Sequence, residues 1–218
     1  MIRNREKIAL IIVDMQKYYL DETSDFSKYS KSYYSSACDY IMKRSFEVVI
    51  PNIFRLKQLF VEKNIPIVYL KLCGTKQNRG DLHRFFRDAH RSALKSGFLS
   101  VYPLESEPMS DVVDELKPTE NDIIIHKKTF SPFTQTNINS LLKKLKVKTL
   151  VFTGLATSQC VETTARDASE RGFSIIHIED CQADYDENTH HVSLYSSRGV
   201  CGGEIYDTAS FINILHEL

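Results

Sequence analysis

The sequence predicts an α/β fold: a doubly wound, mostly parallel open sheet with helices on both faces. Two observations predict it. Short runs of apolar, often β-branched residues alternate along the chain with segments of helical length and periodicity. The strand-like runs are apolar at consecutive positions, which is typical of parallel strands that helices cover on both sides. Such strands must be joined by right-handed crossovers.

Five apolar runs are predicted to be the strands of this sheet. They lie at residues 7–14 (KIALIIVD), 65–71 (IPIVYLK), 122–126 (DIIIH), 148–153 (KTLVFT) and 173–178 (FSIIHI). In open parallel sheets, ligands bind beyond the carboxyl ends of the strands. The residues that directly follow these runs are therefore the first candidates for a functional site.

Helical patterns separate the strand-like runs and also follow the last of them. They lie at about 44–63, 81–96, 136–145, 159–171, 187–196 and 207–217. Residues 21–40 are different, because they are rich in Ser, Tyr and Asp and have no clear period. We expect this segment to be a long surface loop or a lid over the site. The whole of residues 1–218 is predicted to be one domain.

Composition and charge exclude several classes of protein. Of the 218 residues, 42% are hydrophobic and 26% are charged, values typical of a globular protein and not of a disordered one. Lys+Arg and Asp+Glu both number 28, so the chain has no basic surplus for nucleic acid or an anionic membrane. Its apolar runs are too short to span a bilayer. We expect a cytoplasmic protein whose partner is a small molecule.

The five cysteines favour neither a disulfide framework nor a zinc site. Their number is odd, their spacing is wide, and no C-x-x-C pair occurs. At least one thiol must be free, so the question is whether one of them is placed to react. The cysteines are Cys38, Cys73, Cys160, Cys181 and Cys201.

Cys160 has the most favourable position of the five thiols. It follows the predicted strand at 148–153 and a short turn, and it lies at the start of a predicted helix. The positive end of a helix dipole and its free N–H groups favour a thiolate. The same N–H groups can hold a developing oxyanion. The alternative is a small buried residue that only packs under the strand.

Two charged residues end other predicted strands. Asp14 closes the first strand, and burying a carboxylate there is costly unless it has a partner or a task. Lys127 and Lys128 follow the third strand. Taken alone, the aspartate could be a turn-forming cap and either lysine a solvated side chain. A Cys, an Asp and a Lys together at three carboxyl ends of one sheet favour a catalytic site.

Four segments of the sequence resemble the isochorismatase-like cysteine hydrolases. They are ALIIVDMQ at 9–16, KKTFSPF at 127–133, GLATSQCVETTARDA at 154–168 and GFSIIHIEDCQAD at 172–184. The second segment is similar to the family's K-x-x-x-S-x-F pattern. Because the family's catalytic lysine stands four residues before the serine, the resemblance selects Lys127 over Lys128.

The resemblance implies a catalytic triad and an oxyanion hole. Cys160 would attack a carbonyl carbon, Asp14 would carry protons, and Lys127 would hold the aspartate and stabilise charge near the sulfur. The peptide bond between Leu155 and Ala156 would be cis. That geometry would direct the N–H groups of Ala156 and Cys160 at the oxyanion.

The presence of Cys160 also predicts the kind of bond that is cleaved. Family members that hydrolyse the vinyl ether of isochorismate lack this cysteine, so amide, ureide or carbamoyl hydrolysis through a thioester is the better interpretation. Tyr19 and Phe133 are similar to the aromatic walls of the family's substrate pocket. The resemblance further implies a homo-oligomer and no cofactor.

Two alternatives remain open at this point. The nicotinamidase branch of the family carries a metal site like D-x-H after the second strand, where this chain has Leu72-Cys73-Gly74-Thr75. Asp81, His83 and His90 come later, in a segment that is predicted to be helical, where residues two apart do not share a face. No metal site is therefore expected. The second alternative is a catalytically silent binding protein that retains the fold.

The other histidines show no ligand spacing in the sequence, and we interpret them as structural or surface groups. They are His126, His177, His190 and His191.

Overall fold

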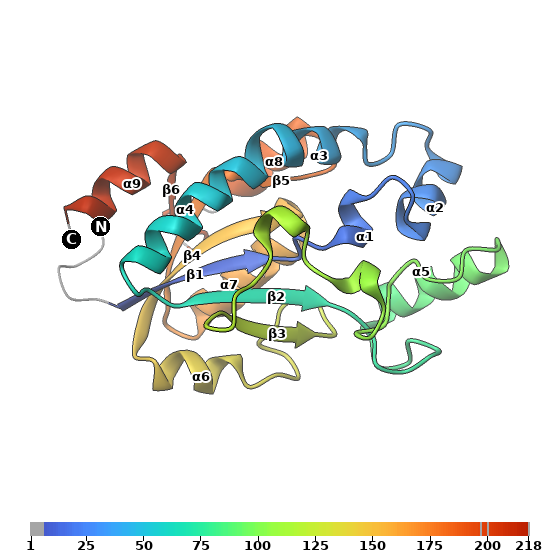
Figure 1. Cartoon of the computed structure of the whole chain (residues 1–218), viewed down its shortest axis with the longest axis horizontal. Helices are drawn as coiled ribbons and strands as arrows, with labels where there is room; N and C mark the ends of the chain where they lie inside the picture. The colour runs from blue at the N-terminus through green and yellow to red at the C-terminus, as the bar shows by residue number, and fades with distance from the viewer. Residues whose placement is uncertain (1–6, 197, 200, 218) are drawn as a thin grey trace.

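Six strands form one all-parallel sheet in the computed structural model, which describes residues 7–196, 198–199 and 201–217 (Figure 1). The strand order is β3-β2-β1-β4-β5-β6. This order reverses direction between β1 and β4, so the sheet is doubly wound, as predicted. The strands are β1 (Lys7–Val13), β2 (Ile67–Leu72), β3 (Ile123–Lys127), β4 (Val147–Leu155), β5 (Ser174–Ala183) and β6 (Glu204–Tyr206).

All five predicted strands are confirmed, and one strand was missed. β4 and β5 run further than their apolar cores, to Leu155 and Ala183. The missed strand, β6, has three residues and adds to the sheet beside β5. A run this short has no apolar pattern for sequence analysis to find.

Helices cover both faces of the sheet, as Figure 1 shows for α4 and α9 on one side and α6 and α7 on the other. No helix among the described residues is long and apolar enough to cross a membrane. The helical segments are α1 (Lys17–Leu20), α2 (Asp25–Tyr33), α3 (Asp39–Arg44), η1 (Ser45–Val49), α4 (Ile50–Glu62), α5 (Arg84–Lys95), η2 (Pro108–Ser110), η3 (Asp114–Leu116), α6 (Ile138–Lys144), η4 (Thr157–Val161), α7 (Glu162–Glu170), α8 (Glu187–Ser196) and α9 (Thr208–His216).

Strand β1 supplies side chains to both layers of the core. Leu10 and Ile12 pack in the cluster that contains Phe60 of α4. Ile11 and Val13 pack in the opposite cluster, toward α6 and α7. Successive side chains of a strand point to opposite faces, so a central strand must be apolar at every position. This explains why the apolar run at the start of the chain is continuous.

Residues 21–40 are not the irregular surface loop that the sequence predicts. The segment contains helix α2 and the start of α3. The Ser24 hydroxyl caps α2 by accepting a hydrogen bond from the backbone N–H of Ser27 at 3.1 Å. Phe26 is buried on this helix. The prediction failed because α2 is short and mostly polar, with Phe26 as its one buried apolar residue.

The ends of β1 and β4 approach each other closely at a glycine. Gly154 pairs with Val13 and has a φ of +100°. A Cβ atom built there would lie 2.1 Å from the carbonyl oxygen of Val13. Only glycine fits this backbone and this spacing. The glycine therefore lets the residue after Val13 and the turn after β4 lie side by side.

We predict that Gly154→Ala lowers the free energy of unfolding by about 2–4 kcal/mol, because it adds a clash to an unfavourable φ. Gly172→Ala is the matched control, since its φ is also positive (+86°) but nothing lies within 4 Å of the added Cβ. That control should cost about 1–2 kcal/mol. Urea unfolding of both variants measures the difference. Equal losses would contradict the close approach of the two strands.

Candidate active site

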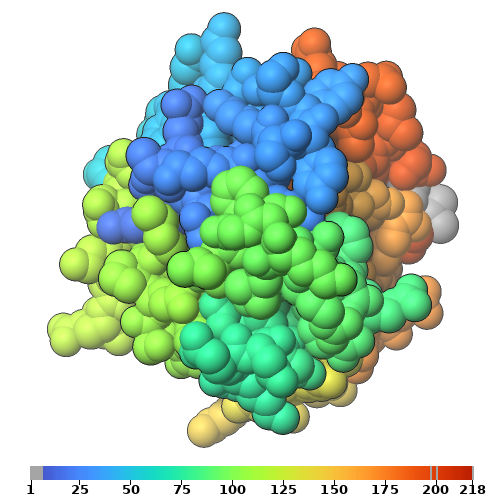
Figure 2. All heavy atoms as spheres, turned by 90° about the vertical axis from the view of Figure 1, so that its right-hand side faces the viewer, coloured from blue at the N-terminus to red at the C-terminus, as the bar shows by residue number. Residues whose placement is uncertain are grey.

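The three predicted catalytic residues meet at the carboxyl ends of the strands, where the strand order reverses. Asp14 follows β1, Lys127 is the last residue of β3, and Cys160 lies in η4, directly after β4. In Figure 1 the strand arrows point to this end of the sheet. The blue segments around α1 and α2 and the green segment around α5 cover it (Figure 2). The candidate site is therefore enclosed by the chain itself.

The Lys127 ammonium group joins the other two side chains. Its Nζ lies 2.8 Å from Asp14 Oδ2 and 3.1 Å from Cys160 Sγ. It also donates to the carbonyl oxygen of Thr129 at 3.2 Å. These partners account for all three N–H donors of the ammonium group. Asp14, Lys127 and Cys160 are 1%, 0% and 4% exposed, so water does not screen the interaction.

Burial and charge together set the protonation of the three groups. Burial raises the pKa of Asp14, and the Lys127 charge opposes that shift. Burial acts to lower the pKa of Lys127, but its interactions with Asp14 and Cys160 outweigh burial and raise this pKa. Burial and the Asp14 charge raise the pKa of the Cys160 thiol. Burial therefore keeps the Cys160 thiol protonated, and the Lys127 ammonium group stays charged beside the Asp14 carboxyl group.

Asp14 is held in a backbone conformation that few residues adopt. Its φ is +49°, and its N–H donates to the carbonyl oxygen of Leu70 at 2.9 Å. The buried Gln16 side chain extends the bonding between β1 and β2, because its Nε2 donates to Leu72 O and its Oε1 accepts from Leu72 N. Gln16 also donates to the carbonyl oxygen of Ser110 at 2.7 Å. These bonds fix the turn that carries the carboxylate.

The turn before Cys160 is fixed by hydrogen bonds from several sides. Within it, the carbonyl oxygen of Ala156 accepts from the N–H groups of Gln159 and Val161. The Asp184 carboxylate, at the end of β5, accepts from the Ser158 N–H at 2.6 Å. The sequence analysis did not identify Asp184 as part of the site. Its place in the last of the four family-like segments was the available signal.

His190 also supports this turn. Its Nδ1 lies 2.8 Å from the Thr157 hydroxyl, and its Nε2 lies 3.2 Å from the Arg44 guanidinium group. Burial and the Arg44 charge lower the pKa of His190 to about 3, so the ring is neutral. The interpretation of this histidine as a structural group is confirmed, and its place beside the nucleophile turn is new.

The predicted cis peptide bond between Leu155 and Ala156 is wrong. No peptide bond among the described residues is cis. Ala156 has extended backbone angles, with φ −84° and ψ 147°. Leu155 is still part of β4 and pairs with Ala183 of β5, so the trans, extended backbone of the strand continues to the turn.

A small hollow borders the Cys160 thiol. Tyr19, which the sequence predicts as a wall of the substrate pocket, is one of its lining residues. The free volume of the hollow is only about 10 Å³, roughly the room that one water needs. Most of the lining is apolar or aromatic. The lining residues are Tyr19, Phe26, Ile41, Leu155, Ala156, Gln159, Cys160 and Tyr185.

Phe133, the other predicted pocket wall, does not line this hollow. Its ring packs against Phe173 at a centroid distance of 6.1 Å, and the Arg171 guanidinium group lies 5.0 Å from its centroid. It belongs to the core cluster toward α6 and α7. The Ser131 hydroxyl, which accepts from the Phe133 N–H and donates to Asp167, turns the segment toward α7. The role of Phe133 as a wall of the substrate pocket stays a prediction.

Asp81 and His83, which follow β2, have partners in their own segments. The Asp81 carboxylate accepts from the N–H groups of Thr75 and Lys76 within its own loop. The His83 ring caps α5 by accepting from the Phe85 N–H. These two side chains therefore serve local structure.

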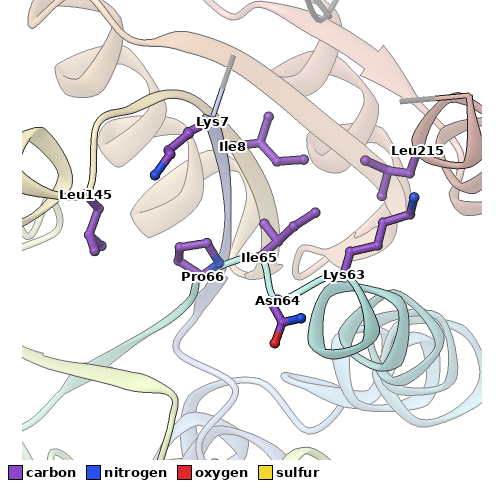
Figure 3. A pocket seen from close by; sticks show the side chains of 8 residues that line it. All are labelled: Lys7, Ile8, Lys63, Asn64, Ile65, Pro66, Leu145 and Leu215. Carbon is purple, nitrogen blue, oxygen red and sulfur yellow. The ribbon is translucent and has the colours of Figure 1, made fainter. Parts of the chain in front are cut away.

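A larger hollow, of about 480 Å³, lies at the opposite, amino end of the strands (Figure 3). Its lining residues include no carboxylate and no thiol, and its charged side chains are those of Lys7 and Lys63. The lining residues are Lys7, Ile8, Lys63, Asn64, Ile65, Pro66, Leu145 and Leu215.

Comparison with protein families matches residues 8–210 to the isochorismatase domain. A ureidoacrylate amidohydrolase of Acinetobacter baylyi is 27% identical over 95% of this chain and 83% of its own length. Nicotinamidase 3 of Arabidopsis thaliana is 31% identical over half of this chain and 59% of its own length.

Solved structures share the fold. A cysteine hydrolase of Pseudomonas syringae pv. phaseolicola superposes with a TM-score of 0.77 at 23% identity, over 97% of this chain and 93% of its own. The N-carbamoylsarcosine amidase of Thermoplasma acidophilum has a TM-score of 0.67 at 22% identity, over 93% of this chain and 96% of its own.

We predict that Asp184→Ala lowers the free energy of unfolding by about 1–3 kcal/mol, because the bond to the Ser158 N–H is lost at a buried acceptor. Asp207→Ala is the control, since this aspartate caps the solvent-exposed start of α9 by accepting from Ser210 N. The control should cost about 1 kcal/mol or less. Chemical denaturation compares the two. A smaller loss for Asp184→Ala than for the control would refute its role in the turn.

Proposed function

The chain belongs to the isochorismatase family, and from that premise we propose that it hydrolyses a non-peptide C–N bond of a small amide, ureide or carbamoyl compound through a cysteine thioester. One observation supports the proposal most: the buried Lys127 ammonium group lies between the Asp14 carboxylate and the Cys160 thiol, at 2.8 and 3.1 Å. This arrangement supplies a nucleophile, a base and a fixed positive charge in one dry site.

The first half of the reaction forms the thioester. Asp14 takes the proton of the Cys160 thiol while Sγ attacks the substrate carbonyl carbon. Lys127 stays protonated and stabilises the negative charge as it moves from the carboxylate to the sulfur. We keep the backbone N–H groups of Ala156 and Cys160 as the proposed donors to the oxyanion of the tetrahedral intermediate, with the peptide bond before Ala156 trans. When the C–N bond breaks, Asp14 returns the proton to the leaving nitrogen.

The second half releases the enzyme. Asp14, now a carboxylate again, takes a proton from water, and the resulting hydroxide attacks the thioester carbon. The same N–H groups hold the second oxyanion. As the C–S bond breaks, the proton returns to Cys160 Sγ and the acid product leaves. One carboxylate therefore performs every proton transfer, which is why its pKa should lie above that of an ordinary aspartate.

The relatives named above support a substrate that carries a terminal carbamoyl or amide group. Two of them are named for a ureido acid and for a carbamoyl amino acid, and another for nicotinamide. All three names denote a carbonyl carbon bonded to an NH₂ group, so cleavage there would release ammonia. The aromatic lining around Cys160 suits a small, flat compound of this kind.

The site must open before such a compound can enter, since its free volume is only about 10 Å³. Phe26 of α2 and Ile41 of α3 form one side of the hollow. Helix α2 is tied to a neighbouring loop by the Asp25 carboxylate, which accepts from the N–H groups of Leu99 and Ser100. The segment 21–40 thus serves as the lid, in helical form.

Ammonia release from a panel of compounds tests the proposal. The panel contains ureido acids, carbamoyl amino acids, biuret-type compounds and nicotinamide, each at neutral pH. Turnover of a ureide or carbamoyl compound supports the proposed class, and turnover of nicotinamide alone favours the nicotinamidase alternative. No turnover of any compound, with a folded protein, supports the silent binding protein.

We predict that Cys160→Ala abolishes turnover, with a loss of at least about 10⁴-fold, while the protein stays folded. The mutation removes the nucleophile but little core volume. Cys181→Ala is the matched control, because Cys181 is also fully buried but contacts the Thr208 hydroxyl outside the site. The control should keep most of the turnover. Comparable turnover by both variants would end the thioester proposal.

We also predict that kcat/KM falls as the pH is lowered. The midpoint of this fall should lie above pH 3.8, the ordinary pKa of an aspartate, because burial raises the pKa of Asp14. Below that midpoint the base is protonated and cannot take the thiol proton; above it, turnover is full. A pH–rate profile, recorded where thermal melting shows a folded protein, measures the midpoint.

Asp14→Asn checks the assignment of that midpoint. It should lower turnover about 10²–10⁴-fold and remove the acid limb. It should also lower the free energy of unfolding by about 3–5 kcal/mol, because Lys127 loses its buried counter-charge. Near-normal turnover would show that Asp14 is not the base.

A further inference from the structure

Three side chains that can bind a metal lie together at the edge of the sheet, outside the catalytic set. The Cys73 sulfur, a Glu105 carboxylate oxygen and a His126 ring nitrogen all lie within 4.8 Å of one another. Cys73 follows β2, His126 lies in β3, and Glu105 lies in the loop between α5 and η2. The spacing in sequence does not indicate this set, because each residue comes from a different segment.

The backbone holds this cluster in place. The Glu105 N–H donates to Gly74 O at 2.9 Å, and the Gly74 N–H donates to Pro103 O at 3.0 Å. The Lys128 ammonium group donates to the Cys73 carbonyl oxygen at 2.6 Å. The loop that carries Glu105 is therefore pinned beside the end of β2, and the three side chains do not depend on flexible segments to meet.

We propose that Cys73, Glu105 and His126 form a binding site for a zinc-type divalent cation. Thiolate, imidazole and carboxylate are the ligands that Zn²⁺ takes in proteins, usually in tetrahedral geometry. A thiolate and a carboxylate together balance the charge of the cation. Glu105 and His126 are partly exposed, so a water molecule can take the fourth position.

The His126 and Glu105 side chains already lie close enough for one cation to contact both. His126 Nδ1 lies 2.6 Å from Glu105 Oε1, so a cation would replace the proton between them. Burial and the Lys71 and Lys128 charges outweigh Glu105 and lower the pKa of His126, which keeps the ring neutral and able to bind a metal. Burial raises the pKa of Cys73 to about 11, so cation binding must release the thiol proton.

The proposed ligands differ from those expected in a nicotinamidase, although Cys73 lies directly after β2, where the D-x-H pattern would stand. The D-x-H residues are missing after β2, and Asp81 and His83 have local partners. The proposed ligands do not include Asp14, Lys127 or Cys160. Because the ligands come from β2, β3 and the loop after α5, a bound cation would tie these three segments together. Its expected effect is on stability.

Cobalt and zinc titrations of chelator-treated protein test the proposal. Co²⁺ should give a thiolate-to-cobalt charge-transfer band, and Zn²⁺ should displace it at one equivalent per chain. Zn²⁺ at ~100 times its Kd should raise the thermal midpoint by about 5–10 °C. Cys73→Ser should remove the band, and His126→Ala should weaken binding at least about tenfold. Cys201→Ser is the control, because it removes a more exposed thiol.

Three results would overturn the proposal. The band could be absent, it could persist in Cys73→Ser, or it could vanish in Cys201→Ser instead. Circular dichroism of each variant shows whether it is folded. Turnover of the metal-free protein should persist, so failure of this site and failure of the proposed hydrolase activity are distinguishable. Turnover that requires metal and is lost in Cys73→Ser would overturn the separation of this site from catalysis.

Discussion

The buried ion pair between Lys127 and Asp14 is the constraint on which the site depends. Removing two charges from water costs several kcal/mol per ion, and only close geometry and additional hydrogen bonds repay it. Here the desolvation cost is offset by the 2.8 Å contact between Lys127 and Asp14. Two further acceptors of the ammonium group, the Cys160 sulfur and the Thr129 carbonyl oxygen, add to it. The Cys160 thiol thus belongs to the network that makes the buried charges tolerable, so the proposed nucleophile and the fold share one set of interactions.

This network requires three strand ends to meet, and the sheet order makes that meeting feasible. β1 and β4 are neighbours at the point where the order reverses, and Gly154 lets their ends approach without a side chain between them. Lys127 lies on β3, two strands away from β1, and its long side chain reaches the site. The side chain is fully buried along the way. Asp184, at the end of β5, holds the turn that carries the nucleophile. The ends of β1, β3, β4 and β5 therefore all contribute to the site.

Sequence analysis succeeded where the physical signal is local. Continuous apolar runs identified β1 to β5, since a strand covered on both faces has no polar position. Asp14, Lys127 and Cys160 could be selected because they follow such runs and match a family pattern. The predictions failed in two places: residues 21–40 contain helices instead of an irregular loop, and the bond after Leu155 is trans.

The two neighbouring residues at the end of β3 show how one strand can serve two sites. Lys127 contacts Asp14 and Cys160, while His126 contacts Glu105. Successive side chains of a strand point to opposite faces, so these two cannot join the same site. A shift of β3 by a single residue would move the lysine out of the catalytic network and the histidine into it. The pairing of Leu72 with Lys127 therefore fixes both sites at once.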